Sequence, residues 1–108
     1  MSENPKSPQK TESEIKKELE EALDQAPWAQ IAPHAQRDRV IVVSTSLKLL
    51  ETGLKIALDD STAIQNWLNQ GALSKPNAVQ LKSWEGEPQR KFKMLIVQPY
   101  VLIQEIVH

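Results

Sequence analysis

Cysteine is absent from this chain of 108 residues, and it holds only two histidines and three glycines. Without cysteine there is no disulfide, no thiolate nucleophile and no cysteine-containing metal site. His34 and His108 form no paired histidine spacing, so we expect no metal site. Gly53, Gly71 and Gly86 form no phosphate-binding loop, and no Gly-x-Ser-x-Gly turn of a serine hydrolase is present. We therefore expect no cofactor, and the pattern leans against an enzyme.

Long apolar runs and a strong excess of positive charge are also missing. The longest runs, residues 94–97 and 101–103, are far shorter than the roughly twenty residues that a membrane span needs. The N-terminus lacks the apolar stretch of a secretory signal, so we expect a cytoplasmic protein. Residues 26–108 hold nine Lys/Arg and seven Asp/Glu. Their net charge of +2 gives too weak a positive field for nonspecific duplex binding, so nucleic acid is disfavoured.

The N-terminal quarter of the chain is acidic, with four lysines and seven Asp/Glu in the first 25 residues. Residues 1–10 contain two prolines and no side chain worth burying, which predicts a disordered arm. We expect residues 11–108 to form a single small α/β domain that begins with an amphipathic helix. Thr11 and Glu14 have the spacing of a capping box at its start. The pattern leaves open whether this helix lies on its own domain or on another chain.

The rest of the chain predicts one helix, one strand, three helices and two final strands. The expected helices begin at Pro27, span 46–58, and follow caps at Asp60 and Asn77; the expected strands are 40–43, 92–97 and 101–106. A helical crossover back to the first strand gives a parallel pair, and the last two strands form an antiparallel pair. The sequence therefore predicts an α/β (α+β) fold, a small mixed three-stranded sheet with about five helices packed mainly on one face.

Two features favour contact with a protein partner. The helix at 46–58 is apolar over about half of its circumference or more, so it needs cover on two sides, from a neighbouring helix or from a second subunit. Trp28, Trp67 and Trp84 lie at apolar positions of predicted helices, where core packing is the default and a partly exposed indole would anchor an interface. The first hypothesis is a non-enzymatic protein-interaction module with a protein partner or as a homodimer.

The alternative is a small-molecule-binding protein or small enzyme with a site near the strand ends. Its candidate residues are polar and lie near the predicted parallel strand, whose carboxyl edge is a usual place for ligands: His34, Arg37, Arg39, Glu51 and Asp60. Asp60 also has the simpler role of a helix cap. A third and weaker possibility is RNA association through residues 90–93, where basic side chains surround Phe92. The identity of any small molecule is unknown.

A series of short motifs follows in a fixed order along the chain. They are Pro27-Trp28, Arg39-Val40-Ile41-Val42-Val43, Leu47-x-Leu49-x-Glu51, Asp59-Asp60, Trp67-Leu68, Lys75-Pro76, Trp84 and Pro99-x-Val101-Leu102-x-Gln104-Glu105. The set resembles a small bacterial family catalogued as domain of unknown function 2288, over about residues 15–106. The sequences around His34 and Tyr100 are similar to those of cyanobacterial members. The resemblance implies a small bacterial protein and brings no reaction, ligand or catalytic residue. Lys48 stands where an acidic residue is expected, which argues against an acidic site around Glu51.

Overall fold

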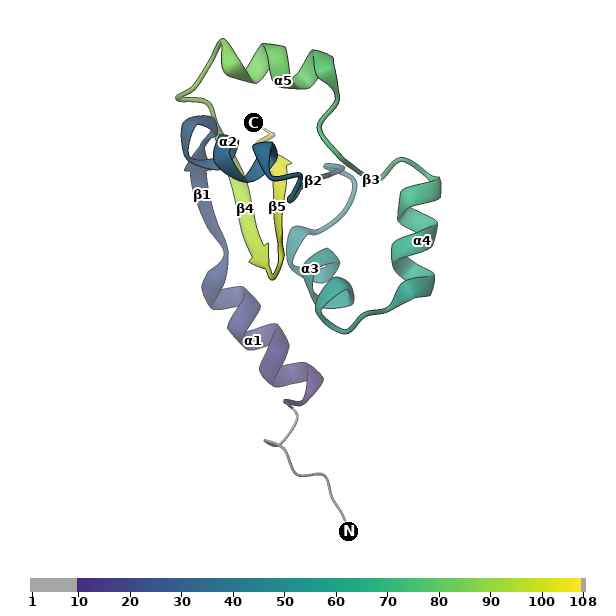
Figure 1. Cartoon of the computed structure of the whole chain (residues 1–108). Helices are drawn as coiled ribbons and strands as arrows, with labels where there is room; N and C mark the ends of the chain where they lie inside the picture. The colour runs from purple at the N-terminus through teal and green to yellow at the C-terminus, as the bar shows by residue number, and fades with distance from the viewer. Residues whose placement is uncertain (1–9, 108) are drawn as a thin grey trace.

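The computed structural model describes residues 10–107. The elements of this part follow one another as α1 (Glu12–Ala22), β1 (Asp24–Pro27), α2 (Trp28–Gln36), β2 (Val40–Val43), α3 (Leu49–Ala57), α4 (Ser61–Asn69), β3 (Leu73–Ser74), α5 (Ala78–Glu85), β4 (Lys91–Val97) and β5 (Tyr100–Glu105) (Figure 1). Residues 1–9 of the predicted arm lie outside the described residues. No helix of the described part is both long and apolar enough to cross a membrane.

The strands form one mixed sheet in the order β1-β4-β5-β2-β3. β2 and β5 are parallel, with Val40 beside Val101, and the three other neighbouring pairs are antiparallel. The mixed α+β class and the predicted parallel and antiparallel pairs are therefore confirmed. The prediction of three strands is wrong, because the sheet has five.

The two strands that the prediction lacked are the two edges of the sheet. β1 has the sequence Asp-Gln-Ala-Pro, which contains no β-branched or aromatic residue, and β3 has only two residues. Neither segment carries a local strand pattern, so each becomes a strand only because a longer neighbour pairs with it.

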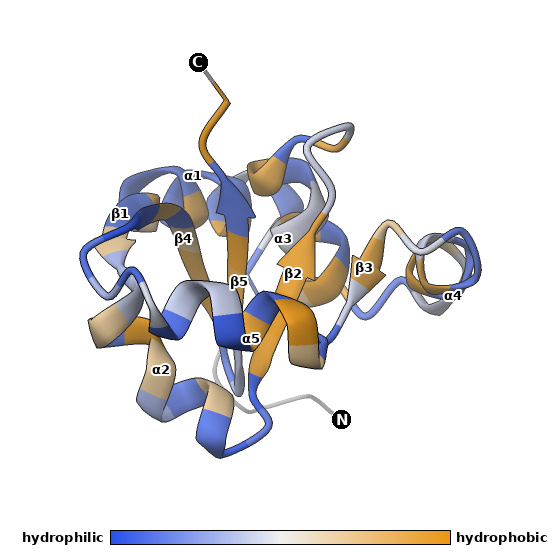
Figure 2. Ribbon diagram, turned by 90° about the horizontal axis from the view of Figure 1, so that it is seen from above, coloured by the Kyte–Doolittle hydropathy of each residue, from blue (hydrophilic) through white to orange (hydrophobic). Residues whose placement is uncertain are grey.

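Helices cover both faces of the sheet, so the prediction of helices mainly on one face is also wrong (Figure 2). Side chains alternate along β4: Phe92 and Met94 point to the face covered by α2 and α5, whereas Leu95 and Val97 point to the face covered by α1 and α3. We call these the α2/α5 face and the α1/α3 face. Strands that are apolar on both sides need cover on both sides.

The cover predicted for the helix at 46–58 comes from this chain itself. α3 lies against β4 and β5 on one side, while α1 and α4 contact its other sides. α1 docks through Leu19, which is 8% exposed. Gly53 lets α3 approach the sheet closely, since a Cβ atom there would lie 2.5 Å from Cδ2 of Leu95. The apolar circumference of α3 therefore does not by itself require a second subunit.

The predicted helix caps are confirmed, whereas the predicted start of α3 is not. The side chains of Thr11, Asp60 and Asn77 accept hydrogen bonds from the first turns of α1, α4 and α5. α3, however, begins at Leu49 and not at residue 46. The reason is a local turn in which Ser44 Oγ accepts from the Ser46 amide at 3.1 Å, a serine bond that competes with the helix.

Candidate functional site

Two of the three tryptophans belong to the core. Trp28 and Trp84 are each 3% exposed, and they pack around Phe92, with ring centroids 4.9 to 6.1 Å apart. Neither indole therefore offers surface to a partner in this structure. Trp67 is half-buried on α4, against the α1/α3 face. Of the tryptophans proposed as anchors, only Trp67 keeps exposed area.

The basic run at residues 90–93 does not form a platform for RNA bases. Phe92 is fully buried, so its ring has no free face on which a base can stack. Arg90 is held by carboxylates: its Nη2 lies 2.6 Å from Glu105 Oε1, and its Nη1 lies 3.4 Å from Glu87 Oε1. The guanidinium also lies over Phe92, 5.6 Å from the ring centroid. Lys91 and Lys93 point to the opposite face of β4 and remain exposed.

The five polar residues proposed as a ligand site do not form one site, because the three basic residues lie together and the two acidic residues lie elsewhere. His34 is in the last turn of α2, Arg37 caps the end of that helix and Arg39 precedes β2. Glu51 lies in the first turn of α3 and Asp60 caps α4. The three basic residues thus lie at the amino end of β2, opposite the predicted carboxyl edge. None of the five lines any of the three cavities below. Within residues 10–107, no group of three or more His, Asp or Glu side chains is placed to hold a metal ion.

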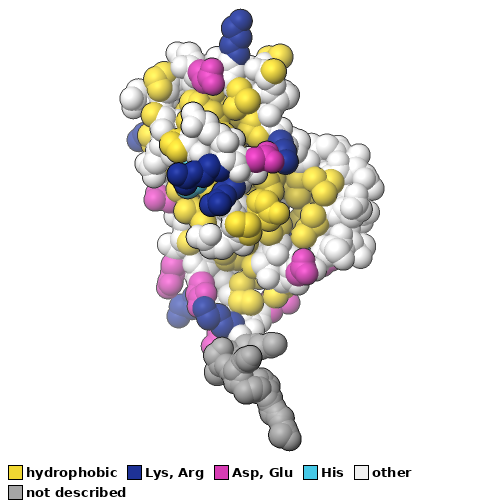
Figure 3. All heavy atoms as spheres, in the orientation of Figure 1, with side chains coloured by type: hydrophobic (Ala, Val, Ile, Leu, Met, Phe, Trp, Pro, Cys, Tyr) yellow, Lys and Arg dark blue, Asp and Glu magenta, His cyan; other side chains and the backbone are white. Residues whose placement is uncertain are grey.

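An apolar groove of 520 Å³ opens between α3, α4 and the hairpin turn that joins β4 to β5. Its apolar lining includes Ile41, Ile56, Ile64, Leu68, Pro99 and Tyr100. Leu68 is 48% exposed and Tyr100 is 41% exposed, although both are large side chains with apolar surface. Figure 3 shows this region as a continuous hydrophobic patch on the surface. We call it the apolar groove.

Charged residues surround the apolar groove. Lys75 Nζ donates to Asp38 Oδ2 over 2.6 Å on one rim, and Asp59 lies on another. Arg39 is the lateral neighbour of Tyr100, because the next residues, Val40 and Val101, are paired in the parallel ladder. Figure 3 shows basic side chains beside the patch. An apolar centre with a charged rim is the usual anatomy of a protein-binding surface.

A second cavity, of 570 Å³, lies at the carboxyl ends of the parallel strands β2 and β5. Its polar lining comes from both edges of the cavity: Asp24 and Gln25 on β1, Thr45 and Lys48 after β2, Lys93 on β4, and Gln104 on β5. Gln104 is 4% exposed, and its Nε2 donates to the carbonyls of Ser44 and Leu47, both over 2.8 Å. We call this space the carboxyl-edge cavity.

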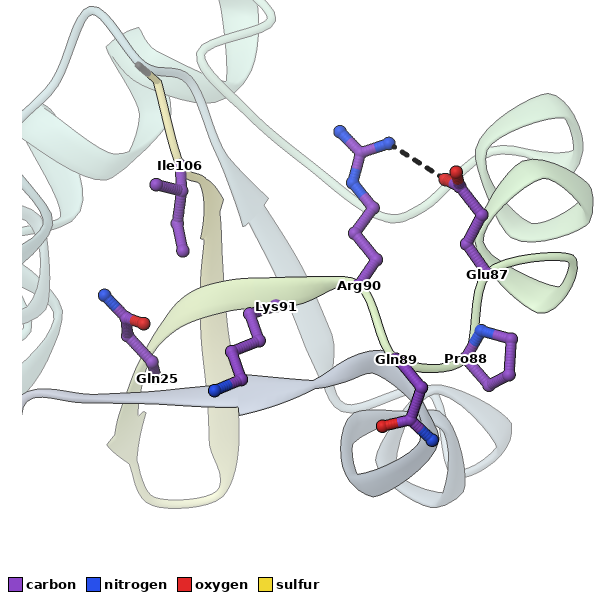
Figure 4. Close-up of a pocket in the computed structure, with 7 residues that line it drawn as sticks. All are labelled: Gln25, Glu87, Pro88, Gln89, Arg90, Lys91 and Ile106. Carbon is purple, nitrogen blue, oxygen red and sulfur yellow. Dashed lines mark hydrogen bonds and ion pairs between the residues drawn. The ribbon is translucent and has the colours of Figure 1, made fainter.

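A third cavity, of 870 Å³, adjoins it, and Gln25 lines both. In Figure 4 the side chains of Gln25 and Lys91 lie on the same side of the sheet below Ile106, while Arg90 points away toward Glu87. The third cavity is also lined by Glu87, Pro88, Gln89 and Arg90. Polar side chains therefore continue from the carboxyl-edge cavity along β1 and β4.

Comparison with known proteins identifies the relatives of this chain. The family model described as a protein of unknown function (DUF2288) matches residues 14–105. The chain belongs to the DUF2288 family. The resemblance inferred from the ordered motifs is thereby confirmed. The fold is also similar to the NMR solution structure of PA1075 from Pseudomonas aeruginosa, with a TM-score of 0.74 and 29% identity over 89% of this chain and 88% of that one. No curated protein matches the chain.

Sequence reasoning missed most of the residues that line the apolar groove and the carboxyl-edge cavity of this DUF2288 protein. A signal for the carboxyl-edge cavity was present: the polar run Ser44-Thr45-Ser46 follows a buried strand and precedes a helix, and Gln104 interrupts an apolar strand. The apolar groove has no such signal. Its members Ile41, Leu68 and Tyr100 come from β2, α4 and β5, and only the fold brings them together.

Proposed function

We propose that this DUF2288 protein is a non-enzymatic protein-interaction module that binds a segment of another protein in the apolar groove. The observation that carries the proposal is the exposure of Leu68 and Tyr100 over a concave apolar lining. Large apolar side chains gathered at the surface of a small domain mark binding sites more often than isolated ones do. Covering them removes apolar area from water, which contributes roughly 25 cal/mol per Å².

The chemistry of the groove favours a segment with aliphatic or aromatic side chains at its centre and charges at its ends. Ile56 and Ile64 supply an apolar floor, and neither carries a group that would orient a polar substrate. Arg39, whose backbone lies beside that of Tyr100, has no acidic side chain within ion-pair distance in the described part of the chain, so its charge is available to a carboxylate of a partner near the groove.

The shape favours a different protein over a second copy. A two-fold dimer sets the same patch of both subunits against each other, so the partner of the groove would be another groove. A concave lining between α4 and the β4–β5 turn is filled better by a protruding helix or loop. Homodimerisation therefore becomes an outcome of the test.

Site-specific photo-crosslinking in the source cell tests the proposal. A photoreactive phenylalanine analogue replaces Leu68 in the full chain, and the matched control carries it at Val79, which is 78% exposed on α5. We expect one discrete adduct with a second protein from position 68 and none from position 79. The adduct should be lost when Tyr100→Glu is added, because a carboxylate then enters the apolar lining.

Each other outcome counts against the proposal. Equal adducts from both positions would show nonspecific contact, and no adduct from position 68 would mean that the groove stays empty. An adduct of twice the mass of the chain would show that the groove binds a second copy of this chain and not a different protein.

A further inference from the structure

We infer, resting on the proposed function of the apolar groove, that its partner segment is an amphipathic helix with carboxylates beside its apolar stripe. Two features of the groove point to this partner. One wall is a helix whose apolar stripe is incompletely covered. Two arginines without an ion-pair partner in the described part of the chain adjoin the apolar lining.

α4 lacks the cover that the other helices of the described part have. Each of α1, α2, α3 and α5 has at least one buried residue, whereas no residue of α4 is buried. Figure 2 shows α4 at the border of the molecule, beyond β3. Ile64 and Leu68 lie four positions apart on α4, so they form one stripe, and both line the groove. An amphipathic helix is stabilised when its apolar stripe is covered, and a partner in the groove would complete the cover of α4.

The sheet edge beside the groove is a poor site for an added strand. β3, the edge strand there, has only two residues and is soon followed by Pro76, which has no amide to donate. Leu73 is 2% exposed, so its backbone is covered as well. Strand addition needs a longer row of free backbone groups. A helix instead presents a stripe of apolar side chains, which packs between α4 and the opposite wall of Ile41, Pro99 and Tyr100.

Two arginines lie next to this apolar lining in a fixed turn. We call residues 37–39 the arginine turn, because Asp38, which lines the groove, lies between Arg37 and Arg39. The amides of both arginines donate to the carbonyl of His34, over 3.1 and 3.0 Å. The carbonyl of Arg39 accepts from an amide of β5 over 2.9 Å. The backbone of the turn is therefore in place before a partner binds, which lowers the entropy lost on binding.

The charges around the groove favour carboxylates on the side of the arginine turn. Both arginines are exposed, and neither has an acidic side chain within ion-pair distance among residues 10–107. The carboxylate of Asp38 is held by Lys75 Nζ over 2.6 Å. Asp59 also lines the groove, has no basic side chain within ion-pair distance among the same residues, and would repel a carboxylate. The partner helix therefore has its acidic residues toward the arginine turn and a neutral or basic residue toward Asp59.

The sequence of the crosslinked segment is the first test. Mass spectrometry of the adduct formed from position 68 of the full chain locates the partner residues that contact the groove. We expect a segment with apolar residues at helical spacing and with Asp or Glu within about one turn of them. A synthetic peptide of this segment should gain helical circular dichroism on binding, and a proline at its centre should abolish binding.

Charge variants of the full chain connect the carboxylates to the arginine turn, with fluorescence anisotropy of the labelled peptide as the measurement. Arg39→Gln should weaken binding about fivefold, because one exposed ion pair is lost. Lys91→Gln is the matched control and should leave binding unchanged. Lys91 is also exposed and free of ion pairs within residues 10–107, but it lies at the opposite end of β4 from the turn that borders the groove.

A charge exchange separates direct contact from an effect on folding. A peptide with lysine in place of its acidic residue should bind the Arg39→Glu chain more tightly than it binds the parent chain, which a merely destabilised variant would not do. Arg37→Gln should weaken binding of the original peptide as Arg39→Gln does. Because Arg37 also suits the carboxyl end of α2, the amide NMR spectrum of the unbound variant has to match that of the parent chain.

Four results would overturn this partner class and leave the proposed function standing. They are a contacting segment without acidic residues, binding that tolerates the central proline, equal effects of Arg39→Gln and Lys91→Gln, and no gain from the charge exchange. The absence of any adduct from position 68 is a different result, because it removes the proposed function itself and the partner class with it.

Discussion

The α2/α5 face and the α1/α3 face belong to one sheet, but helices cover them to different extents. On the α2/α5 face, Trp28, Trp84 and Phe92 interlock at ring distances of 4.9 to 6.1 Å and are at most 3% exposed. On the α1/α3 face, α3 sits tightly over the centre, and the apolar groove and the carboxyl-edge cavity lie beside it. Two bulky indoles fill the space between the sheet and the short helices α2 and α5. On the other face, Gly53 lets α3 lie close to the sheet, and the two cavities remain on either side of α3.

The two faces therefore differ in which side chains are buried in the core and which are exposed to solvent. Both faces hold a buried core, but the exposed side chains that line the apolar groove, Leu68 and Tyr100, belong to the α1/α3 face. A small domain has few large apolar side chains with which to build its core. A large apolar side chain that stays exposed therefore contributes little to stability. Substitutions on the two faces should therefore have different effects on stability.

The largest effect is expected from truncation of the aromatic cluster. Trp84→Ala should lower the free energy of unfolding by about 3 to 5 kcal/mol, because it removes a buried indole and leaves a cavity. The matched control Trp67→Ala, at a half-buried position on the other face, should cost about 1 to 2 kcal/mol. Urea unfolding measures both. Equal losses would mean that the two faces contribute alike, which would remove the basis of the comparison.

A smaller loss is expected at the centre of the α1/α3 face. Gly53→Ala places a Cβ atom 2.5 Å from Cδ2 of the fully buried Leu95, so α3 or Leu95 has to move. Overpacking of this kind costs about 1 to 3 kcal/mol, against about 1 kcal/mol gained in helix propensity. We expect a net loss of about 1 kcal/mol in the free energy of unfolding. Gly86→Ala, with its nearest neighbour at 3.4 Å, is the control and should be close to neutral. A stabilised Gly53→Ala variant would contradict close packing of α3.

Local patterns sufficed for the elements that carry their own signal. The β-branched run at β2 has the predicted bounds, and the caps at Thr11, Asp60 and Asn77 form the predicted bonds. Each depends on residues a few positions apart, so the chain needs no tertiary partner to specify it. β1 and β3 were not predictable in this way, because a neighbouring strand defines them.

The layering and the candidate sites were harder to predict. The alternation of Phe92 and Met94 with Leu95 and Val97 already implies a strand covered on both faces, but it does not say which helix covers which side. Similarly, Trp28, Trp67 and Trp84 share the same local pattern, and only their neighbours decide that two are buried and one is not. Residues that line the apolar groove come from four or more elements, so its existence follows from the assembled fold.

A modest, pH-dependent effect should be confined to the α1/α3 face. The backbone amide of Ala63 donates to Asp60 and lowers the pKa of its carboxyl below the ordinary 3.8, with a smaller contribution from Lys55. Because the folded pKa is depressed, this cap stabilises α4 fully above the ordinary value and loses its effect as the pH falls through the folded pKa. The protection factors of the α4 amides, which compare their exchange rates with those of an unstructured chain at the same pH, should therefore fall in acid. Asp60→Asn keeps a capping oxygen without an acidic proton, so its protection factors should depend less on pH; an unchanged dependence would assign the effect to another group.

The smallest change in stability is expected where the largest change in binding is proposed. Leu68→Ser removes an apolar side chain that is 48% exposed at the apolar groove, so the free energy of unfolding should change by no more than about 0.5 kcal/mol. The same variant should abolish contact with the groove's partner, because the apolar area available for burial is lost. Urea unfolding beside Trp84→Ala gives the direct comparison. A loss of about 2 kcal/mol or more for Leu68→Ser would show that the groove is part of the core, and the separation of stabilising residues from the residues proposed to bind would then fail.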